Sequence, residues 1–413
     1  MSKKGFKFRI YPDKDQIVLL ERTLGCCRFI WNKLLDDSIQ KYEYLVLNPD
    51  LPKPRLSGYD FSKEVTNIKQ SHDWLYEVAN VPLQQSALNL GKAFANYFRN
   101  KKNNAFKPRV KPKKNKTGTF KEALLNTPGH PQFKKKHNHQ SFTLTRAAFK
   151  IKNNQFFIAK CDKHLKIKWS RELPSEPSSC TISKTSSGQY FVSFICDYVP
   201  KLTYGKGIIG IDLGIKDFAV CSKGESVKNP KHYVKLQKCL RKHQRKLNKC
   251  QKGSSRKNKA RIKVAKIHQR ISNLRNDFLH KLSTRLVSEN QAIVIENLKV
   301  SNMIRNRKLS KHIADASWSK FRQLLEYKVK DSLWCRLLIA DQYYPSTQLC
   351  SVCYQKPKQK LALKIREWTC EYCGSTHQRD ENASINLEHL ATRNSELWIN
   401  HPGKIILIEA YNR

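Results

Sequence analysis

The chain has 413 residues, of which 79 are lysine or arginine and 33 are aspartate or glutamate, so its formal net charge is +46. Nucleic acid is the expected partner, because each phosphate that a basic side chain neutralises releases counterions and strengthens binding. An anionic membrane surface is the alternative, but the sequence has no apolar run of 18 or more residues and no secretory signal peptide. With 39% hydrophobic residues, we expect a soluble, intracellular protein with two or three domains and true hydrophobic cores.

The first half of the chain is predicted to combine helices with a small β domain. Residues 6–11 alternate apolar and basic side chains, which indicates a strand, and apolar residues at helical spacing predict helices after Pro12 and from Pro82 to Arg99. Residues 99–121 hold ten lysines or arginines and no acid, which favours a solvated basic loop, although such a loop could also contact a phosphate backbone. Short alternating runs over 140–199 predict an antiparallel barrel, to which residues 6–11 would contribute a strand.

An apolar run from Ile208 to Val220 is interrupted by a single carboxylate that its flanks predict to be buried, Asp212. The neighbouring glycines, Gly210 and Gly214, would let another backbone or a phosphate approach closely. An unpaired buried carboxylate is costly, so Asp212 needs a cation or a hydrogen-bond donor. A structural pair with a lysine or arginine is the simplest way to meet that need.

The second half of the chain alternates helical and strand patterns. Residues 223–275 hold 19 lysines or arginines and one acid, and apolar residues from Ile267 to Leu286 mark one face of a long helix. So strong an excess of positive charge on the other face of that helix favours contact with nucleic acid over a merely solvated surface. A second buried strand ends on a carboxylate, Glu296, and a helix over 317–329 leads into a third apolar strand at 337–340. Helices between such strands predict a mixed α/β sheet.

Four of the thirteen cysteines have a regular spacing, Cys350-x2-Cys353 and, after sixteen residues, Cys370-x2-Cys373. Two such pairs suit one tetrahedral zinc ion, and the site would be structural because no position is left open for a substrate. Reduced core thiols would not need paired spacing, and a redox centre would need only one pair. The other nine cysteines, in an intracellular chain, are interpreted as buried or incidental thiols.

A helix is expected to begin near His377, with Asp380 close to its N-terminus, where a carboxylate also suits the helix dipole. Asp212, Glu296 and Asp380 therefore lie at strand, strand and helix positions. Brought together, they would hold two divalent cations about 4 Å apart, one activating a water and the other stabilising the leaving oxygen of a phosphodiester. Magnesium fits this role, since it prefers carboxylates, waters and substrate phosphates. Three separate structural carboxylates are the alternative.

The sequence resembles the TnpB proteins, which are transposon-encoded, RNA-guided DNA endonucleases related to the compact type V CRISPR nucleases. The resemblance extends from Tyr11 to about Leu390 and rests on residues 210–217, 277–284, 295–298, Ser346-x-Gln348-x-Cys350 and 379–383. It implies a RuvC-like nuclease of RNase H fold, with Asp212, Glu296 and Asp380 as its metal-binding triad and the four cysteines in an inserted zinc ribbon.

The resemblance also implies a domain order. A wedge-like β barrel would comprise residues 1–12 and 135–204, interrupted by a helical recognition domain with its basic loop at 13–134. The nuclease domain would comprise 205–343 and 377–392, with the zinc ribbon at 344–376 between its two parts. Residues 393–413 would form a C-terminal tail.

The partners that the resemblance implies are a guide RNA from the transposon end and double-stranded target DNA, in a prokaryotic cytosol. The sequence does not determine the oligomeric state, for which a monomer is favoured. Guide pairing would select the target, while the protein reads a short adjacent motif; Gln84 is the candidate base contact. One alternative is a guided DNA-binding repressor that has lost cleavage, but all three acids are present. The other is a transposase that joins strands, for which the sequence offers no second catalytic domain and no nucleophilic tyrosine or histidine pair.

Overall fold

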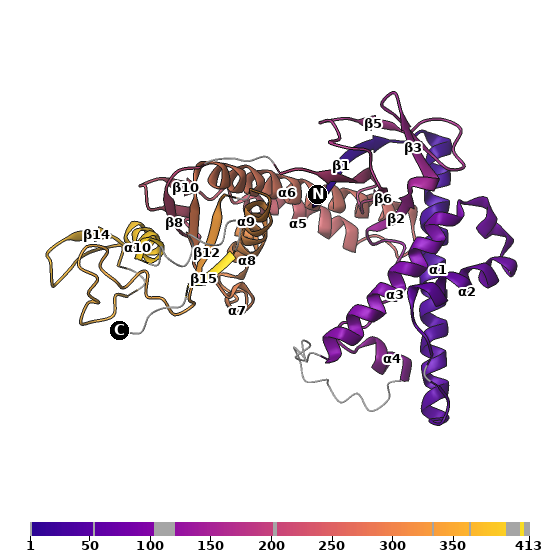
Figure 1. Cartoon of the computed structure of the whole chain (residues 1–413), viewed down its shortest axis with the longest axis horizontal. Helices are drawn as coiled ribbons and strands as arrows, with labels where there is room; N and C mark the ends of the chain where they lie inside the picture. The colour runs from indigo at the N-terminus through magenta and orange to yellow at the C-terminus, as the bar shows by residue number, and fades with distance from the viewer. Residues whose placement is uncertain are drawn as a thin grey trace. The chain divides into compact units, whose positions relative to one another are not determined.

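The computed structural model describes residues 2–52, 54–102, 120–200, 205–332, 334–362, 365–393 and 405–408. The chain divides into two compact units, Met1–Val199 and Pro200–Arg413 (Figure 1). Most of the predicted basic loop, residues 103–119, lies outside the described residues. Within the described ranges, no helix has both the length and the apolar composition needed to cross a membrane.

The first unit contains the two helices that the sequence predicts, as α1 and α3. A capping box starts α1, in which the Asp13 carboxylate accepts from Gln16 N at 2.8 Å and Gln16 Oε1 accepts from Asp13 N at 3.0 Å. A further helix, α2, packs on α3 at a close backbone approach between Gly58 and Gly91. The helices of this unit are α1 (Lys14–Leu47), α2 (Gly58–Gln70), η1 (Asp73–Glu77), α3 (Asn80–Lys102) and α4 (Phe120–Leu125).

The strands of the first unit form an antiparallel sheet in the order β2-β6-β7-β1-β5. Its central pair joins β1, which contains the predicted strand 6–11, to β7, and the turn between β6 and β7 has Gly188 at a φ of 84°. One continuous core joins this sheet to the helices. The strands are β1 (Ser2–Tyr11), β2 (Gln140–Thr145), β5 (Lys166–Lys168), β6 (Ser179–Lys184) and β7 (Tyr190–Tyr198).

The predicted barrel is not confirmed, because the described strands leave this sheet open with β2 and β5 at its edges. A short 3-10 turn, η2 (Arg146–Ala148), follows β2 and redirects the chain into a separate hairpin of β3 (Phe149–Lys152) and β4 (Gln155–Ile158). A single bridge, Phe156 to Leu165, connects this hairpin to the segment before β5. The hairpin's phenylalanines pack on Phe194 in β7, at ring-centroid distances of 6.3 and 5.2 Å, so they cover the sheet instead of extending its edge.

The second unit is built on a mixed sheet in the order β10-β9-β8-β11-β12-β15, as the alternating pattern predicts. The strands β8, β11, β12 and β15 run parallel, and β9 and β10 continue the sheet antiparallel. Within the expected C-terminal tail, β15 therefore adds an edge strand to this sheet. The strands are β8 (Ile208–Asp212), β9 (Asp217–Cys221), β10 (Ser226–Lys228), β11 (Ala292–Ile295), β12 (Arg336–Ala340) and β15 (Ile405–Ile408).

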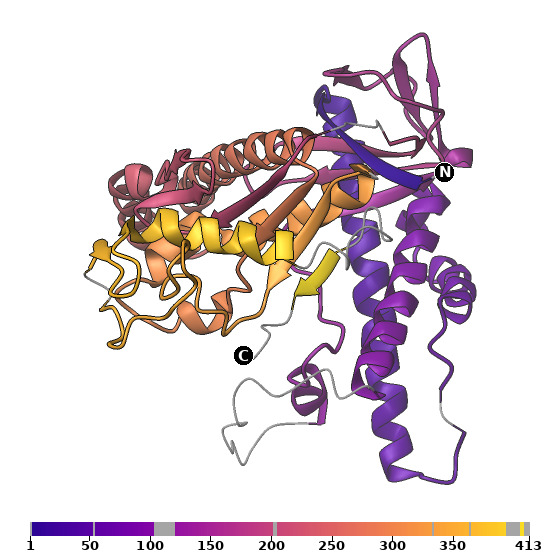
Figure 2. The same ribbon diagram turned by 60° about the vertical axis from the view of Figure 1, so that its left-hand side comes forward.

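Helices cover both faces of this sheet, and strand alternation assigns the side chains to them. In β11, Ile293 and Ile295 pack with α6 (Ser255–Glu289) and α9 (Trp318–Ser332), whereas Ala292 and Val294 pack with α10 (Arg379–Arg393). Figure 2 shows α10, in yellow, lying along its face of the sheet. The remaining helices of the unit are α5 (His232–Asn248), which packs on α6, α7 (Val300–Met303) and α8 (Ser310–Ala316).

Gly210 in β8 explains how closely α10 approaches the sheet. A Cβ atom at this position would lie 2.0 Å from Ser384 O and 2.6 Å from Glu388 N, both backbone atoms of α10. The close approach that the sequence predicts at this glycine is therefore that of a helix backbone. This contact sets how deeply α10 sits on β8.

Replacement of Gly210 by alanine is expected to destabilise the second unit by about 3 kcal/mol, because helix and strand backbones must separate to admit the methyl group. Thermal and denaturant unfolding would measure the change. Gly25→Ala is the matched control: Gly25 lies inside α1 with its nearest atom, in the Arg28 side chain, 3.9 Å from the added carbon. That control should stabilise by about 0.5–1 kcal/mol through helix propensity. Equal effects of the two substitutions would contradict the packing argument.

Candidate functional site

Two of the predicted carboxylates lie side by side at one end of the parallel strands. Ile211 in β8 is in register with Ile295 in β11, so Asp212 and Glu296, one residue further along each strand, are neighbours. Both continue the alternation of Gly210 and Val294, which face α10. The sheet therefore presents both carboxylates on the α10 side.

Asp380 reaches the same face from the first turn of α10. Gln378 supplies the side-chain cap of that helix, since its Oε1 accepts from Glu381 N at 2.9 Å. The Asp380 carboxylate instead accepts from Arg366 Nη1, at 3.0 Å to Oδ1 and 3.1 Å to Oδ2. Capping therefore does not account for Asp380, whose partner comes from the cysteine-containing insert.

Burial and like charge dominate the electrostatics of this group. Burial raises the pKa of Asp212, the negative charges of Glu296 and Asp380 raise it further, and the charge of Arg379 opposes them. Burial also raises the pKa of Glu296, against a hydrogen bond from the Ser346 hydroxyl that lowers it. Among the described ion pairs, neither Asp212 nor Glu296 has a lysine or arginine partner, so a simple structural pair does not explain them. The donor chemistry fits a divalent cation.

Open space adjoins Glu296 on two sides. It lines one cavity of about 280 Å³ together with Asp341 and Tyr344. It also lines a second cavity of about 270 Å³ together with Leu213 and Arg322. The side chain is therefore accessible to a ligand although its strand is buried.

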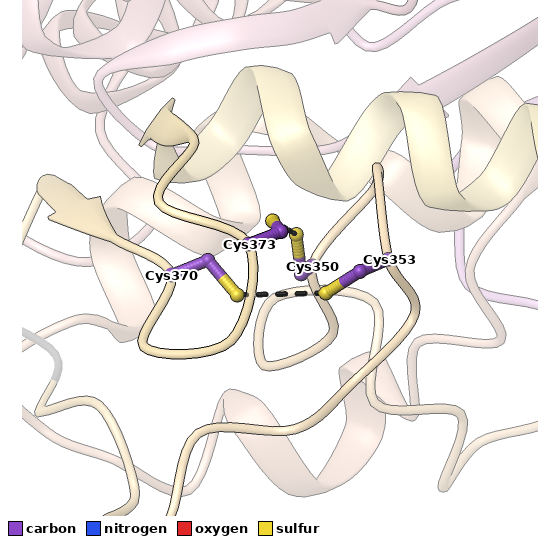
Figure 3. Close-up of side chains that lie close together, drawn as sticks. All are labelled: Cys350, Cys353, Cys370 and Cys373. Carbon is purple, nitrogen blue, oxygen red and sulfur yellow. Dashed lines mark hydrogen bonds between the residues drawn. The ribbon is translucent and has the colours of Figure 1, made fainter.

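The four predicted cysteines meet in one cluster (Figure 3). Their sulfur atoms all lie within 4.8 Å of one another, with Cys350 Sγ 3.7 Å from Cys373 Sγ and Cys353 Sγ 3.5 Å from Cys370 Sγ. Within the described residues, no other group of three or more acidic, histidine or cysteine side chains has its ligand atoms this close together. The carboxylates of Asp212, Glu296 and Asp380 therefore lie farther apart than the four sulfur atoms. The arrangement suits a tetrahedral metal ion.

Two neighbouring side chains surround this cysteine cluster with hydrogen-bonding groups. His377 Nε2 lies 3.1 Å from Cys350 Sγ and 2.8 Å from Ser375 Oγ. Ser375 Oγ also lies 3.0 Å from Cys373 Sγ, and hydrogen bonds from its hydroxyl and its backbone lower the pKa of the Cys373 thiol to about 6. Such contacts to ligating sulfurs orient them and favour the thiolate.

The basic segment folds as two helices, α5 and α6, and the predicted long helix with one packed and one charged face corresponds to α6. Ile271, Leu282 and Leu286 of α6 are buried, whereas Leu274, expected on the same face, is 39% exposed. Within residues 223–275, the exposed lysines and arginines of these helices are Lys235, Lys238, Arg241, Lys242, Arg245 and Lys246 on α5 and Arg256, Lys259, Lys263, Lys266 and Arg270 on α6. Gln84, the predicted base contact, lies half-buried near the start of α3, and its role stays a prediction.

Comparison with known proteins assigns the chain to a family. A family model described as "Probable transposase" matches residues 189–307. The chain is 38% identical over 393 residues to a Streptomyces pristinaespiralis protein named "Putative RNA-guided DNA endonuclease", and the alignment covers 93% of this chain and 88% of that protein. The chain belongs to the TnpB family.

Other matches of this TnpB chain agree with the assignment. It is 27% identical to "Putative RNA-guided DNA endonuclease InsQ" of Escherichia coli K12, over 93% of this chain and 91% of that protein. A cryo-EM structure of a Cas12f1–sgRNA–target DNA complex has a TM-score of 0.53 at 12% identity, covering 94% of this chain and 98% of Cas12f1. That likeness shows the fold, which is the RuvC-containing fold of TnpB and Cas12 proteins.

Two further family models match the TnpB chain, one at its start and one over residues 318–387. A "Helix-turn-helix domain" model matches residues 1–44, where the structure has one strand, β1, and the single helix α1. A "Cas12f1-like, TNB domain" model matches residues 318–387, which hold the cysteine cluster and Asp380. Asp212 and Glu296 fall within the range of the transposase model.

Sequence reasoning did not find two side chains that contact the carboxylates of this TnpB protein, Ser346 and Arg366. Ser346 appears in a motif that marks the family resemblance, which was the available signal for it. Arg366 lies between the two cysteine pairs with no pattern around it. Its contact with Asp380 depends on how the insert folds back onto α10.

Proposed function

We propose that this chain is an RNA-guided DNA endonuclease that hydrolyses phosphodiesters at a centre formed by Asp212, Glu296 and Asp380. The observation that carries the proposal is the placement of Asp212 and Glu296 as neighbours on the sheet face that α10 covers, with Asp380 in the first turn of that helix. The names of two relatives support the reaction, since both are named "Putative RNA-guided DNA endonuclease". A net charge of +46 matches two polyanionic partners.

The three carboxylates would hold magnesium, which when bound supplies an activated water and stabilises the leaving oxygen, in an arrangement of two ions. The fold presents Asp212 and Glu296 at the C-terminal ends of β8 and β11 and shields them beneath α10. The exposed cationic faces of α5 and α6 would neutralise a nucleic-acid backbone.

The remaining assignments belong to the same proposal. The cysteine cluster would bind one structural zinc ion, because four thiols leave no open position. The guide RNA would come from the transposon end, and Gln84 would contact a base of the short motif beside the double-stranded target. The protein would act as a monomer.

The test is to co-express the protein with a candidate transposon-end RNA, purify the complex, and incubate it with a plasmid library of randomised flanks. Cleavage is expected only with the RNA, with magnesium and next to particular flanks, and a chelator should stop it. RNA-dependent binding without cleavage would instead favour a guided repressor. Products in which DNA strands are joined would favour a transposase.

A further inference from the structure

Ser346 lies at the junction between the nuclease sheet and the cysteine insert. Its side chain is buried, with 3% of the residue exposed, and its hydroxyl donates a hydrogen bond of 2.5 Å to Glu296 Oε1. A hydroxyl that donates to a carboxylate makes a short, charge-assisted bond. The bond gives Oε1 of Glu296 a fixed partner, and a divalent cation at this centre could still be held by the carboxylate.

The backbone that carries Ser346 is clamped by α10. Asn386, fully buried, donates from Nδ2 to Ser346 O at 2.8 Å and to Leu349 O at 2.6 Å. One turn earlier, Asn382 donates to the same Leu349 carbonyl at 2.7 Å and accepts from Ser351 N at 2.9 Å. These two amides on one helix face therefore hold the segment that runs from Ser346 into the first cysteine pair.

Glu296 needs such support because its surroundings work against a fixed position. It neighbours Asp212, a like charge, and a cavity opens on either side of it. A glutamate has three side-chain torsions, so without a partner it would lose entropy when it binds a cation. A buried donor on a clamped backbone removes part of that cost in advance.

We propose that Ser346 is a positioning residue for Glu296, which orients this carboxylate for binding a divalent cation and couples it, through the Asn382 and Asn386 clamp, to the cysteine insert. The proposal rests on the proposed function for its metal centre. It assigns a role to a side chain that does not itself touch the metal or the substrate.

The test measures metal binding without cleavage. Mn²⁺ would be titrated into the full-length protein free of nucleic acid, with free Mn²⁺ followed by electron paramagnetic resonance. Binding at the carboxylate centre is defined as the part lost in Asp212→Asn. Ser346→Ala is expected to weaken that part about 10- to 100-fold, whereas Ser346→Thr, which keeps the hydroxyl, should restore most of it.

Ser351→Ala is the matched control, a buried serine in the same segment whose described bond uses the backbone N–H that alanine retains. It should leave Mn²⁺ affinity unchanged. Cleavage by Ser346→Ala should recover in part at high magnesium, with a raised half-saturating concentration and unchanged RNA binding.

Unaltered Mn²⁺ affinity in Ser346→Ala would overturn the proposal, as would equal weakening in the Ser351 control. If Ser346→Ala fails to fold, Ser346→Cys supplies a near-isosteric side chain with a much weaker donor, and it should weaken Mn²⁺ binding while retaining zinc. A wild-type protein that binds Mn²⁺ at this centre but never cleaves would contradict the proposed function, while the comparison between variants would still decide the role of Ser346.

Discussion

Asp212→Asn is expected to reduce DNA cleavage by roughly 10³-fold or more, the order seen when one member of a catalytic unit is removed. The substitution keeps the shape of the side chain but removes the charge that a divalent cation requires. RNA-dependent binding to target DNA should stay within about twofold of wild type, because base pairing and backbone contacts supply it. Plasmid cleavage and a mobility-shift titration on the same preparation would measure both quantities.

Asp277→Asn is the matched control for this prediction. Asp277 is an exposed carboxylate on α6 that pairs with Lys281 at 2.8 Å, an i,i+4 surface pair of small energetic value. It should cleave like wild type. If Asp212→Asn cleaved at the wild-type rate, the assignment of this carboxylate to the metal centre would be wrong.

Asp212→Asn should also raise the stability of the folded protein when a chelator is present. This direction follows from the raised pKa of Asp212. A carboxyl group whose pKa is higher in the folded state than in the unfolded state contributes its full stability at pH values below the unfolded-state pKa of about 4. That contribution is lost as the pH rises through the raised pKa of the folded state. Asparagine cannot ionise and loses nothing. The melting temperature of Asp212→Asn should therefore exceed that of wild type by a margin that grows from about pH 4 upward, and magnesium should reduce the margin.

The part of this site that the sequence predicts is the part that depends on local pattern. The apolar runs before Asp212 and Glu296 predict two buried strands. Because these strands run parallel, the carboxylates that follow them lie together at the C-terminal ends of the strands. The spacing of the two cysteine pairs likewise predicts that they meet in one cluster. In each case the pattern itself is local, because it consists of an apolar run directly followed by its carboxylate or of two cysteines separated by two residues.

The features that sequence reasoning missed depend on tertiary contacts. Strand β6 has the sequence Ser-Cys-Thr-Ile-Ser-Lys, whose polar members hide its alternation, and it forms because β2 and β7 pair with it on both sides. The predicted barrel depended on how the short strands pair, and in the described residues β3 and β4 pair with each other as a separate hairpin. Ser346 and Arg366 touch carboxylates 50 and 14 residues away, and no local pattern reports such contacts.

Cys370→Ser is expected to abolish zinc binding and to unfold the insert between β12 and α10, because that insert has a very small core of its own. Its buried cluster consists of Cys350, Trp368 and Cys370, so two of its three members would be metal ligands. A structural zinc ion contributes about 10 kcal/mol or more to the folding of such small units. Metal analysis and limited proteolysis of the insert would measure the two effects, and zinc chelation should reproduce both in wild type.

Unfolding of the insert should also reduce DNA cleavage, even though the sheet of the second unit stays folded. The reason is that the insert supplies the hydrogen-bond donors to two of the carboxylates, Ser346 to Glu296 and Arg366 to Asp380. Cys239→Ser is the control, an exposed thiol on α5 outside the cluster, and it should retain zinc, protease resistance and cleavage. Full cleavage by a zinc-free Cys370→Ser protein would show that the carboxylates keep their geometry without the insert. The cysteine cluster would then stabilise only its own segment, and the link from zinc to the nuclease centre would be wrong.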